Sequence, residues 1–397
     1  MLVSTVELLS RARRAKTLGI TGAENLSLDW PALIARKDDI VARWSKGKNA
    51  APAKLGIPVL QGHGQFIAPR EVVVDGRSYS AGKFIVATGS KPARPAIPGA
   101  ELGITSDELI HLKTQPKELA VVGGGFIGLE FGFALAWAGT KVTVLQSGPQ
   151  IAPALDEEIR EILLAAAKQA GITIKTNVKV KGIAHDKTVE AEINGCPETF
   201  AADEVLLATG RPSNVEPLNP GAAGIDLDRG AVKVNEYLQS VSAPHVYAVG
   251  DAAGKHQHSP VAWYEGPIAA HNALKGNEQK IDFSVFPSAI FTIPAIGQVG
   301  LTEKEALDRG FKAKVSKLTY DSNPAAGVRN ETEGLVKVVY EEGTEKIFGA
   351  HVIGARAEDI VQIAAVAIKC GLKKSEVGSM HYVFPTIGGA IFDTMAS

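Results

Sequence analysis

The chain has 397 residues, which is more than one compact domain normally holds and fits two or three domains. Hydrophobic residues make up 45% and charged residues 21%, so extensive disorder is excluded. The 42 Lys and Arg balance 43 Asp and Glu, and no apolar run is long enough for a membrane span, so neither nucleic acid nor membrane is an expected partner. With two cysteines there is no disulfide framework, and a reducing, cytoplasmic compartment is expected.

The N-terminal stretch is basic, as transit peptides are, but its apolar residues recur at helical spacing. Leu2, Val6 and Leu9 share one side, while the arginines within 11–14 face elsewhere. This pattern predicts an amphipathic helix with a solvated basic face.

Six short β-rich runs follow, most of them almost continuously apolar, as in strands covered on both faces. They lie at 84–89, 119–125, 141–146, 172–177, 204–210 and 246–251. Helical patterns separate several of them, and Asp156 is a candidate N-cap for a helix that stops at Gly171. This alternation predicts an α/β fold with parallel strands.

Two of these strands end alike, with an apolar run followed by Ala-Thr-Gly and a nearby proline. The copies are FIVATGSKP at 84–92 and EVLLATGRP at 204–212. Their repetition predicts two nucleotide-binding domains of Rossmann type, one inserted into the other.

The C-terminal part has a different pattern. Alternating β-type sequence precedes Thr302 and Glu305, which have the spacing of a helix capping box. Further strands are predicted at 333–340 and 346–353, and a helix at 357–370. We expect a separate α+β domain with an antiparallel sheet.

The most informative local motif is the glycine-rich run GGGFIG, placed between a strand and a helix. Gly123 would form the tight turn, Gly125 would let the backbone approach a pyrophosphate, and Gly128 would allow close packing of helix on strand. Amides near Phe126 and Ile127 would then face the phosphates at the helix N-terminus. Since a second strand follows in βαβ register, the motif predicts dinucleotide binding.

The residue after that second strand does not decide which dinucleotide binds. An acidic residue there favours NAD, and a nearby arginine favours NADP. This chain has Gln146, which can hydrogen-bond ribose without repelling a phosphate. The predicted coenzyme is therefore NAD(P).

Together, the motifs resemble the pyridine nucleotide–disulfide oxidoreductase family, especially its mercuric reductase-like and dihydrolipoamide dehydrogenase-like members. The motifs that carry the resemblance, in chain order, are ATGSKP, GGGFIGLE, ATGRP, VYAVGDAAG, FTIPAIGQVGLTEKEA and GARAEDIVQ. The resemblance implies a homodimeric flavoenzyme that uses FAD and NAD(P)H and reduces a small-molecule electron acceptor.

The resemblance also assigns residues. Gly250 and Asp251 match the corner that binds the ribitol of FAD, although an acid there could instead cap a helix. Glu130 matches a glutamate that pairs with a lysine beside flavin and nicotinamide, and its alternative role is to favour the helix N-terminus. Gly89 and Gly210, in the Ala-Thr-Gly turns, are counted with the cofactor-binding residues.

The chain departs from the family pattern at its N-terminus. The family's first strand, its Gly-rich turn for FAD and its Cys-x-x-x-x-Cys pair have no counterpart in the sequence. Residues 2–15 look like the continuation of the helix that carries those cysteines. We expect a truncated chain without thiol–disulfide catalysis.

A second departure lies near the C-terminus, where the family's disulfide reductases have His-Pro-Thr. Here Phe384 precedes proline, and phenylalanine cannot transfer protons. His381 is interpreted as an ordinary histidine, and Cys370 as a core thiol on an apolar helix. Cys196 is assigned to a turn.

The remaining candidate ligands are two histidines, His256 and His258, in the run GKHQHSP. They have no companion ligand at a suitable spacing, so they are interpreted as loop residues and no metal site is predicted.

The predicted architecture has three parts. They are an FAD domain at 1–112 and 242–284, an inserted NAD(P) domain at 113–241, and a dimerisation domain at 285–397. The predicted function is FAD-dependent oxidation of NAD(P)H. The alternatives are a non-catalytic NAD(P)-binding dimer and a quinone or dioxygen reductase on the same scaffold.

Overall fold

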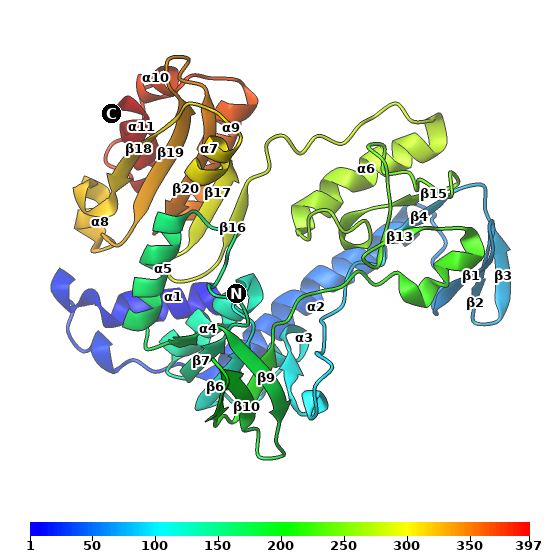
Figure 1. Cartoon of the computed structure of the whole chain (residues 1–397), viewed down its shortest axis with the longest axis horizontal. Helices are drawn as coiled ribbons and strands as arrows, with labels where there is room; N and C mark the ends of the chain where they lie inside the picture. Colours follow the sequence, from blue (N-terminus) through cyan, green and yellow to red (C-terminus); the bar gives the residue numbers. More distant parts are fainter. The chain divides into compact units, whose positions relative to one another are not determined.

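The computed structural model describes all 397 residues, apart from the side chain of Asn49. The chain forms two compact units, and each is assembled from separate stretches of sequence. Unit 1 consists of residues 1–37, 94–209 and 284–397, and unit 2 of residues 38–93 and 210–283. Figure 1 follows the chain in colour from its N-terminus to its C-terminus.

Unit 1 contains a five-stranded parallel sheet with the strand order β5-β12-β6-β7-β8. Its strands are β5 (Ile104–Thr105), β6 (Glu118–Val122), β7 (Lys141–Leu145), β8 (Thr173–Lys175) and β12 (Glu204–Leu207). Val121, Val144 and Leu206 are fully buried, which explains why these strands have continuously apolar sequences. The predicted α/β class with a parallel sheet is confirmed.

Three helices accompany this sheet, namely α3 (Ser106–Leu109), α4 (Phe126–Ala138) and α5 (Glu157–Gln169). The predicted cap of α5 is confirmed, since Asp156 Oδ1 accepts a hydrogen bond of 3.1 Å from the Glu158 amide. The helix buries Ile159 and Leu163, and Gly171 follows it with φ of +76°.

Two three-stranded antiparallel sheets were not predicted. Unit 1 contains β9 (Val178–Ile183), β10 (Val189–Ile193) and β11 (Cys196–Phe200), and unit 2 contains β1 (Gly64–Ala68), β2 (Glu71–Val74) and β3 (Arg77–Ser80). Each has a hairpin closed by two left-handed residues, Asn194-Gly195 or Asp75-Gly76. Asn-Gly and Asp-Gly are strong hairpin signals, so this feature could have been found in the sequence.

The C-terminal part of unit 1 is built on an antiparallel sheet with the order β16-β17-β20-β19-β18. Its strands are β16 (Ser288–Ile290), β17 (Ile296–Gly300), β18 (Ala313–Thr319), β19 (Leu335–Glu341) and β20 (Ile347–Ile353), and its helices are α7 (Glu303–Asp308), α8 (Pro324–Arg329), α9 (Ala357–Lys369), α10 (Lys374–Gly378) and α11 (Ala390–Ala396). The capping box predicted for Thr302 and Glu305 is present at the start of α7. The predicted antiparallel α+β character of this region is therefore confirmed.

The N-terminal helix is α1 (Leu2–Arg13), which packs against α4 and buries Val6 and Leu9. The expectation of a solvated basic face holds only in part, because the side chain of Arg11 is 48% exposed but Arg13 and Arg14 are partly buried. Arg13 donates hydrogen bonds to the carbonyl oxygens of Leu26 and Trp137, and Arg11 pairs with Glu331 at 2.7 Å. A guanidinium can satisfy carbonyl and carboxylate oxygens at the edge of a core, and periodicity alone does not reveal such partners.

The long helix α2 (Trp30–Lys54) begins in unit 1, where Trp30 is buried and its Nε1–H donates to the Leu112 carbonyl at 2.8 Å. Unit 2 also contains α6 (Ser259–Lys275), the short pair β13 (Leu227–Asp228) and β14 (Ala231–Val232), and a parallel pair, β4 (Phe84–Val86) with β15 (Val246–Ala248). No helix in the described part of the chain combines the length and apolar character that a membrane span requires.

Candidate functional site

The glycine turn after β6 has the geometry that the sequence motif requires. Gly123 has φ of +115°, and a Cβ on it would lie 2.3 Å from the Ala208 carbonyl oxygen. A Cβ on Gly128 would lie 2.1 Å from the carbonyl oxygen of Gly123, so helix and turn approach too closely for any side chain. Gly125 differs, because nothing lies within 4 Å of its Cβ position. The backbone is thus crowded on the protein side and open at Gly125.

This open position caps α4, a thirteen-residue helix that begins at Phe126. The first amides of a helix have no intrahelical acceptor, and they carry the positive end of the helix dipole. Phe126 and Ile127 are the first two residues of this helix. An open backbone at the carboxyl edge of a parallel sheet, with helix amides above it, fits the pyrophosphate of a dinucleotide.

Gln146, at the end of β7, is tied to this turn. Its Oε1 accepts a hydrogen bond of 2.9 Å from the Gly124 amide. The carbonyl end of the amide is therefore engaged, and the side chain adds no negative charge where a ribose would bind. A neutral amide at this position is compatible with the ribose of NAD and with the 2′-phosphate of NADP.

Sequence reasoning missed a second support of the same turn, the loop between β7 and α5. Its Ala152 amide donates a 3.0 Å hydrogen bond to the Gly124 carbonyl, and Ile151 is buried against Gly124. Ala152 has φ of +39°, a left-handed conformation that is strained for alanine. The residue types of this loop give no sequence signal for its hydrogen bond to Gly124.

Glu130 lies on α4, two residues beyond Gly128, and is half-buried. Its Oε1 accepts a 2.9 Å hydrogen bond from the Phe291 amide. Burial raises the pKa of Glu130, and the bond from Phe291 offsets part of that rise. Burial thus favours the protonated form of this carboxyl relative to an exposed glutamate.

In unit 2, the residues that follow β4 pair with residues 210–214. The amides of Lys91 and Ala93 donate to the carbonyls of Pro212 and Gly210, at 3.0 and 2.9 Å, and Asn214 donates to Gly89 at 2.8 Å. The segments after the two Ala-Thr-Gly turns therefore form a short antiparallel ladder. Gly89 and Gly210 both have positive φ, at +67° and +112°.

Asp251 follows β15 and caps neither neighbouring helix. Its Oδ2 accepts a 2.5 Å hydrogen bond from the Ser90 hydroxyl, which in turn accepts one of 3.1 Å from Arg211 Nε. Behind the corner, Glu265 Oε2 accepts a 2.6 Å hydrogen bond from the Gly250 amide. The half-exposed carboxylate at the carboxyl end of a parallel pair fits a role in holding a polyol such as ribitol.

Ser90 and Glu265 were not identified from the sequence. Glu265 is completely buried, its Oε1 has no hydrogen-bond partner, and burial raises its pKa. Burying a carboxyl group without hydrogen-bond partners costs free energy. A buried glutamate on a helix therefore indicates a specific structural or functional role.

The remaining candidates do not gather into a site. The interpretation of Cys370 as a core thiol is wrong. Cys370 is the C-cap residue of α9, and its side chain is exposed. Cys196 is also exposed, directly after the Asn194-Gly195 turn. The part of the chain that the structure describes contains no group of three or more His, Cys, Asp or Glu side chains arranged to hold a metal.

Comparison with known proteins gives the class. A family profile described as pyridine nucleotide-disulphide oxidoreductase matches residues 11–273, and the dimerisation domain of the same family matches residues 286–394. The chain therefore belongs to the pyridine nucleotide-disulphide oxidoreductase family, whose related members use FAD and NAD(P)H. The resemblance identified from the sequence is confirmed.

Individual relatives include mercuric reductase from Bacillus cereus, 35% identical over 89% of the chain, and dihydrolipoyl dehydrogenase from Thermus scotoductus, 32% identical over 99%. Among solved structures, the HOCl-induced flavoprotein disulfide reductase RclA from Escherichia coli has a TM-score of 0.87 at 26% identity, covering 98% of this chain and 89% of that one. The matched region is 86% of the dihydrolipoyl dehydrogenase but 56% of the mercuric reductase. The chain thus spans little more than half the length of the latter.

Proposed function

We propose that this chain is an FAD-dependent NAD(P)H oxidoreductase, mercuric reductase-like or dihydrolipoamide dehydrogenase-like, that passes electrons to a small-molecule acceptor. The observation that carries the proposal is the open backbone at Gly125 between two crowded glycines. In this proposal the turn at 123–128 holds the coenzyme pyrophosphate, and Gln146 lies beside the ribose.

The flavin part of the proposal rests on unit 2. Gly250 and Asp251 would hold the ribityl chain, with Ser90 and Glu265 fixing the corner and Gly89 in the adjoining turn. When bound, FAD supplies the redox chemistry that amino acid side chains lack. Glu130, with its raised pKa, would exchange a proton or orient a donor near the nicotinamide.

The proposal excludes thiol–disulfide exchange by the residues of this chain. Cys196 and Cys370 are both free and exposed, and they are 174 positions apart in sequence rather than in a Cys-x-x-x-x-Cys pair. A proton-transferring histidine is likewise replaced by Phe384, whose ring is exposed. In this proposal, neither Cys196 nor Cys370 takes part in reducing the acceptor.

We further propose a homodimer formed through residues 285–397. This region exposes large apolar side chains, among them Val366, Val383 and Phe384. Val383 and Phe384 are neighbours in the sequence, and contiguous exposed apolar side chains are typical of a protein interface. The assignment of 1–112 and 242–284 to FAD and of 113–241 to NAD(P) belongs to the same proposal.

Gly125→Val tests the carrying observation. The Cβ of the new side chain lies more than 4 Å from the surrounding protein atoms, while the side chain occupies the proposed space of the pyrophosphate. NADH binding should therefore weaken about tenfold or more, since each charge-assisted hydrogen bond contributes about 1.5–3 kcal/mol. The matched control is Gly327→Val in α8, where nothing lies within 4 Å either. Unchanged NADH affinity in a folded Gly125→Val protein would reject the proposal.

A second candidate, a dimer that binds NAD(P) without holding flavin, is favoured by one observation: in the described residues β4 pairs only with β15. The absorbance spectrum of the purified protein separates the two. Bands of oxidised flavin favour the oxidoreductase, and a colourless protein that binds NADH favours the alternative.

A further inference from the structure

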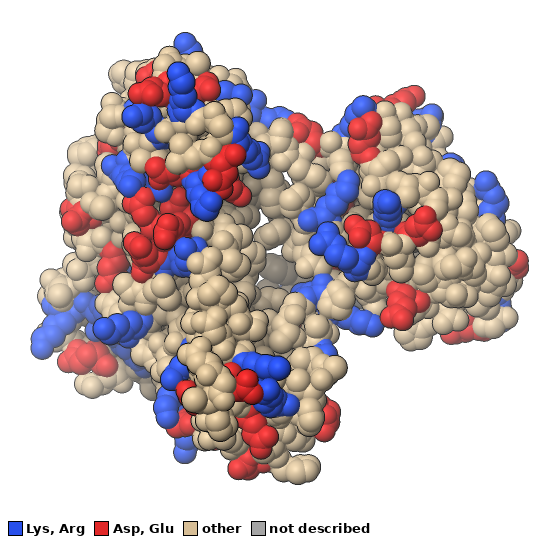
Figure 2. Space-filling view, viewed as in Figure 1, with Lys and Arg blue, Asp and Glu red and all other residues tan. Residues whose placement is uncertain are grey.

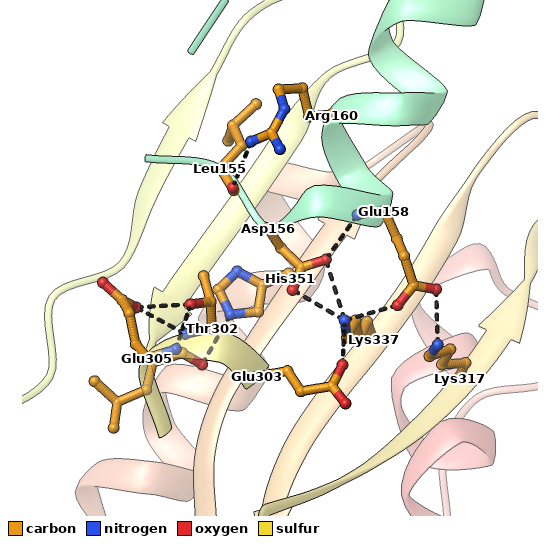
Figure 3. A network of polar contacts seen from close by, with 11 residues as sticks. Leu155, Asp156, Glu158, Arg160, Thr302, Glu303, Glu305, Lys317, Lys337 and His351 are labelled. Atoms are coloured by element: carbon orange, nitrogen blue, oxygen red, sulfur yellow. Dashed lines mark hydrogen bonds and ion pairs between the residues drawn. The ribbon is translucent and has the colours of Figure 1, made fainter. Parts of the chain in front are cut away.

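The strongest polar cluster in unit 1 surrounds Lys337, which lies on β19 and is 2% exposed. Its Nζ lies 3.0 Å from Asp156 Oδ2, 2.7 Å from Glu158 Oε1 and 2.8 Å from Glu303 Oε2. Figure 3 shows the ammonium group between these three carboxylates, two from the start of α5 and one from the start of α7. A single buried cation therefore ties both helix starts to the C-terminal sheet.

This lysine is charged at any ordinary pH. Burial alone would lower the pKa of Lys337, but hydrogen bonds to Glu158, Glu303 and Asp156 outweigh it and raise the pKa. Removing one charged partner leaves the other buried charges uncompensated, which costs stability. The cluster therefore holds the starts of α5 and α7 firmly against β19.

The residues beside Lys337 in the sheet are polar as well. Lys317 and His351 lie directly opposite it on the two neighbouring strands, and Gln298 lies opposite His351. Side chains in such a row share one face of the sheet. This row interrupts an otherwise apolar face at the point where α5 begins.

The surface around the cluster is acidic. Figure 2 shows acidic side chains gathered with a few basic ones over the region of α5 and α7. A pocket of about 610 Å³ there is lined by Asp156, Glu303 and Lys337 among others, so apolar packing between the two helix starts is incomplete. The ion pairs of Lys337 connect the two helix starts beside this pocket.

Asp156 is also the last residue of the loop that supports the glycine turn. From Asp156 the loop runs back through Leu155, whose amide donates to Ala152 at 3.0 Å, to the hydrogen bond between the Ala152 amide and the Gly124 carbonyl. Since Ala152 is held in a strained left-handed conformation, contacts at both ends of the loop must maintain it.

We infer that Lys337 is a positioning residue for the nicotinamide dinucleotide. By holding Asp156, it anchors the outer end of the loop 147–156, and the inner end of that loop fixes the backbone of Gly124 beneath the pyrophosphate. This inference rests on the proposed function, and it makes a residue of the C-terminal sheet part of the support of the coenzyme site.

The test uses the full chain with NADH and NADPH as probes. Lys337→Met and Asp156→Asn should each weaken binding of both nucleotides about five- to tenfold, the lower range of coupling between linked sites. Asp156→Asn keeps a side-chain oxygen for the helix cap, so it removes the ion pair alone. The control is Lys181→Met, whose exposed pair with Glu192 spans 2.8 Å in the same unit.

Hydrogen exchange separates positioning from general stability. In Asp156→Asn without nucleotide, exchange should accelerate in the loop 147–156 and at the glycine turn, and stay unchanged in β9 to β11. Uniform acceleration across unit 1, or binding within about twofold of the parent protein in a folded Asp156→Asn, overturns the inference. If the parent protein binds neither nucleotide, the proposed function fails, and the inference falls with it.

Discussion

Strands β12 and β4 are both mostly apolar and both lead into Ala-Thr-Gly, but their surroundings differ sharply. Leu206 in β12 and Ile85 in β4 occupy equivalent positions before Ala-Thr-Gly. β12 pairs with β5 on one edge and β6 on the other, and Leu206 is 0% exposed. In the described residues β4 pairs only with β15, and Ile85 is 43% exposed.

This comparison shows that the sequence of a strand does not by itself determine how deeply its side chains are buried. An apolar run becomes core only where neighbouring strands and helices cover it. In unit 1 that neighbour is β6, the strand that leads into the glycine turn.

The largest expected effect tests this difference directly. Leu206→Ala should lower the free energy of unfolding by about 3 kcal/mol, because it leaves a cavity beside an inner strand of the sheet. Ile85→Ala should cost about 1 kcal/mol or less, because the side chain is already half in solvent. Urea unfolding of both variants measures the two costs. Equal costs would show that Ile85 is covered in solution by something beyond the described contacts.

The turns after the two strands should differ less. Neither Gly89 nor Gly210 has an atom within 4 Å of its Cβ position, so alanine brings only backbone strain. Gly89→Ala, at φ of +67°, should cost about 1 kcal/mol, and Gly210→Ala, at +112°, about 2 kcal/mol. Thermal unfolding checks the order, and a costlier Gly89→Ala would contradict it.

The smallest effects concern pH, and two carboxyl groups, one in each unit, should respond in opposite directions. In unit 2, burial raises the pKa of Glu265, so the folded form holds its proton longer, and stability falls as pH rises above the ordinary carboxyl range. In unit 1, burial would raise the pKa of Glu158, but hydrogen bonds from Lys317 and Lys337 outweigh it and lower the pKa. Its contribution is therefore lost as pH falls below that range.

Unfolding measured across pH in Glu265→Gln and Glu158→Gln separates these contributions. The first variant should flatten the curve above the ordinary carboxyl range, and the second below it. Each variant serves as the control of the other, and a Glu265→Gln curve that keeps its slope on the alkaline side would refute the assignment.

Much of the fold could be predicted from local sequence. The six parallel-type strands, the caps Asp156 and Thr302, and the glycine turn depend on interactions within a few residues, which spacing reveals. The missed hairpins at Asn194-Gly195 and Asp75-Gly76 were equally local and carried a clear turn signal.

The supporting residues of the site could not be found in this way. Ala152 lies 28 positions beyond Gly124, and Lys337 lies 181 positions beyond Asp156. Their contacts depend on how elements pack, and an alanine or a strand lysine looks ordinary in sequence. Cys370 was misassigned for the related reason that an apolar helix still has an end that faces solvent.

The four tryptophans are divided equally, with Trp30 and Trp137 in unit 1 and Trp44 and Trp263 in unit 2. Trp30, buried in unit 1 with its indole N–H bonded to a carbonyl, should emit at short wavelength and shift strongly to the red on unfolding. Trp44 and Trp263 of unit 2 are 68% and 74% exposed, so their emission should already resemble that of the unfolded chain. The intrinsic fluorescence spectrum should therefore change when unit 1 unfolds and change little when unit 2 unfolds.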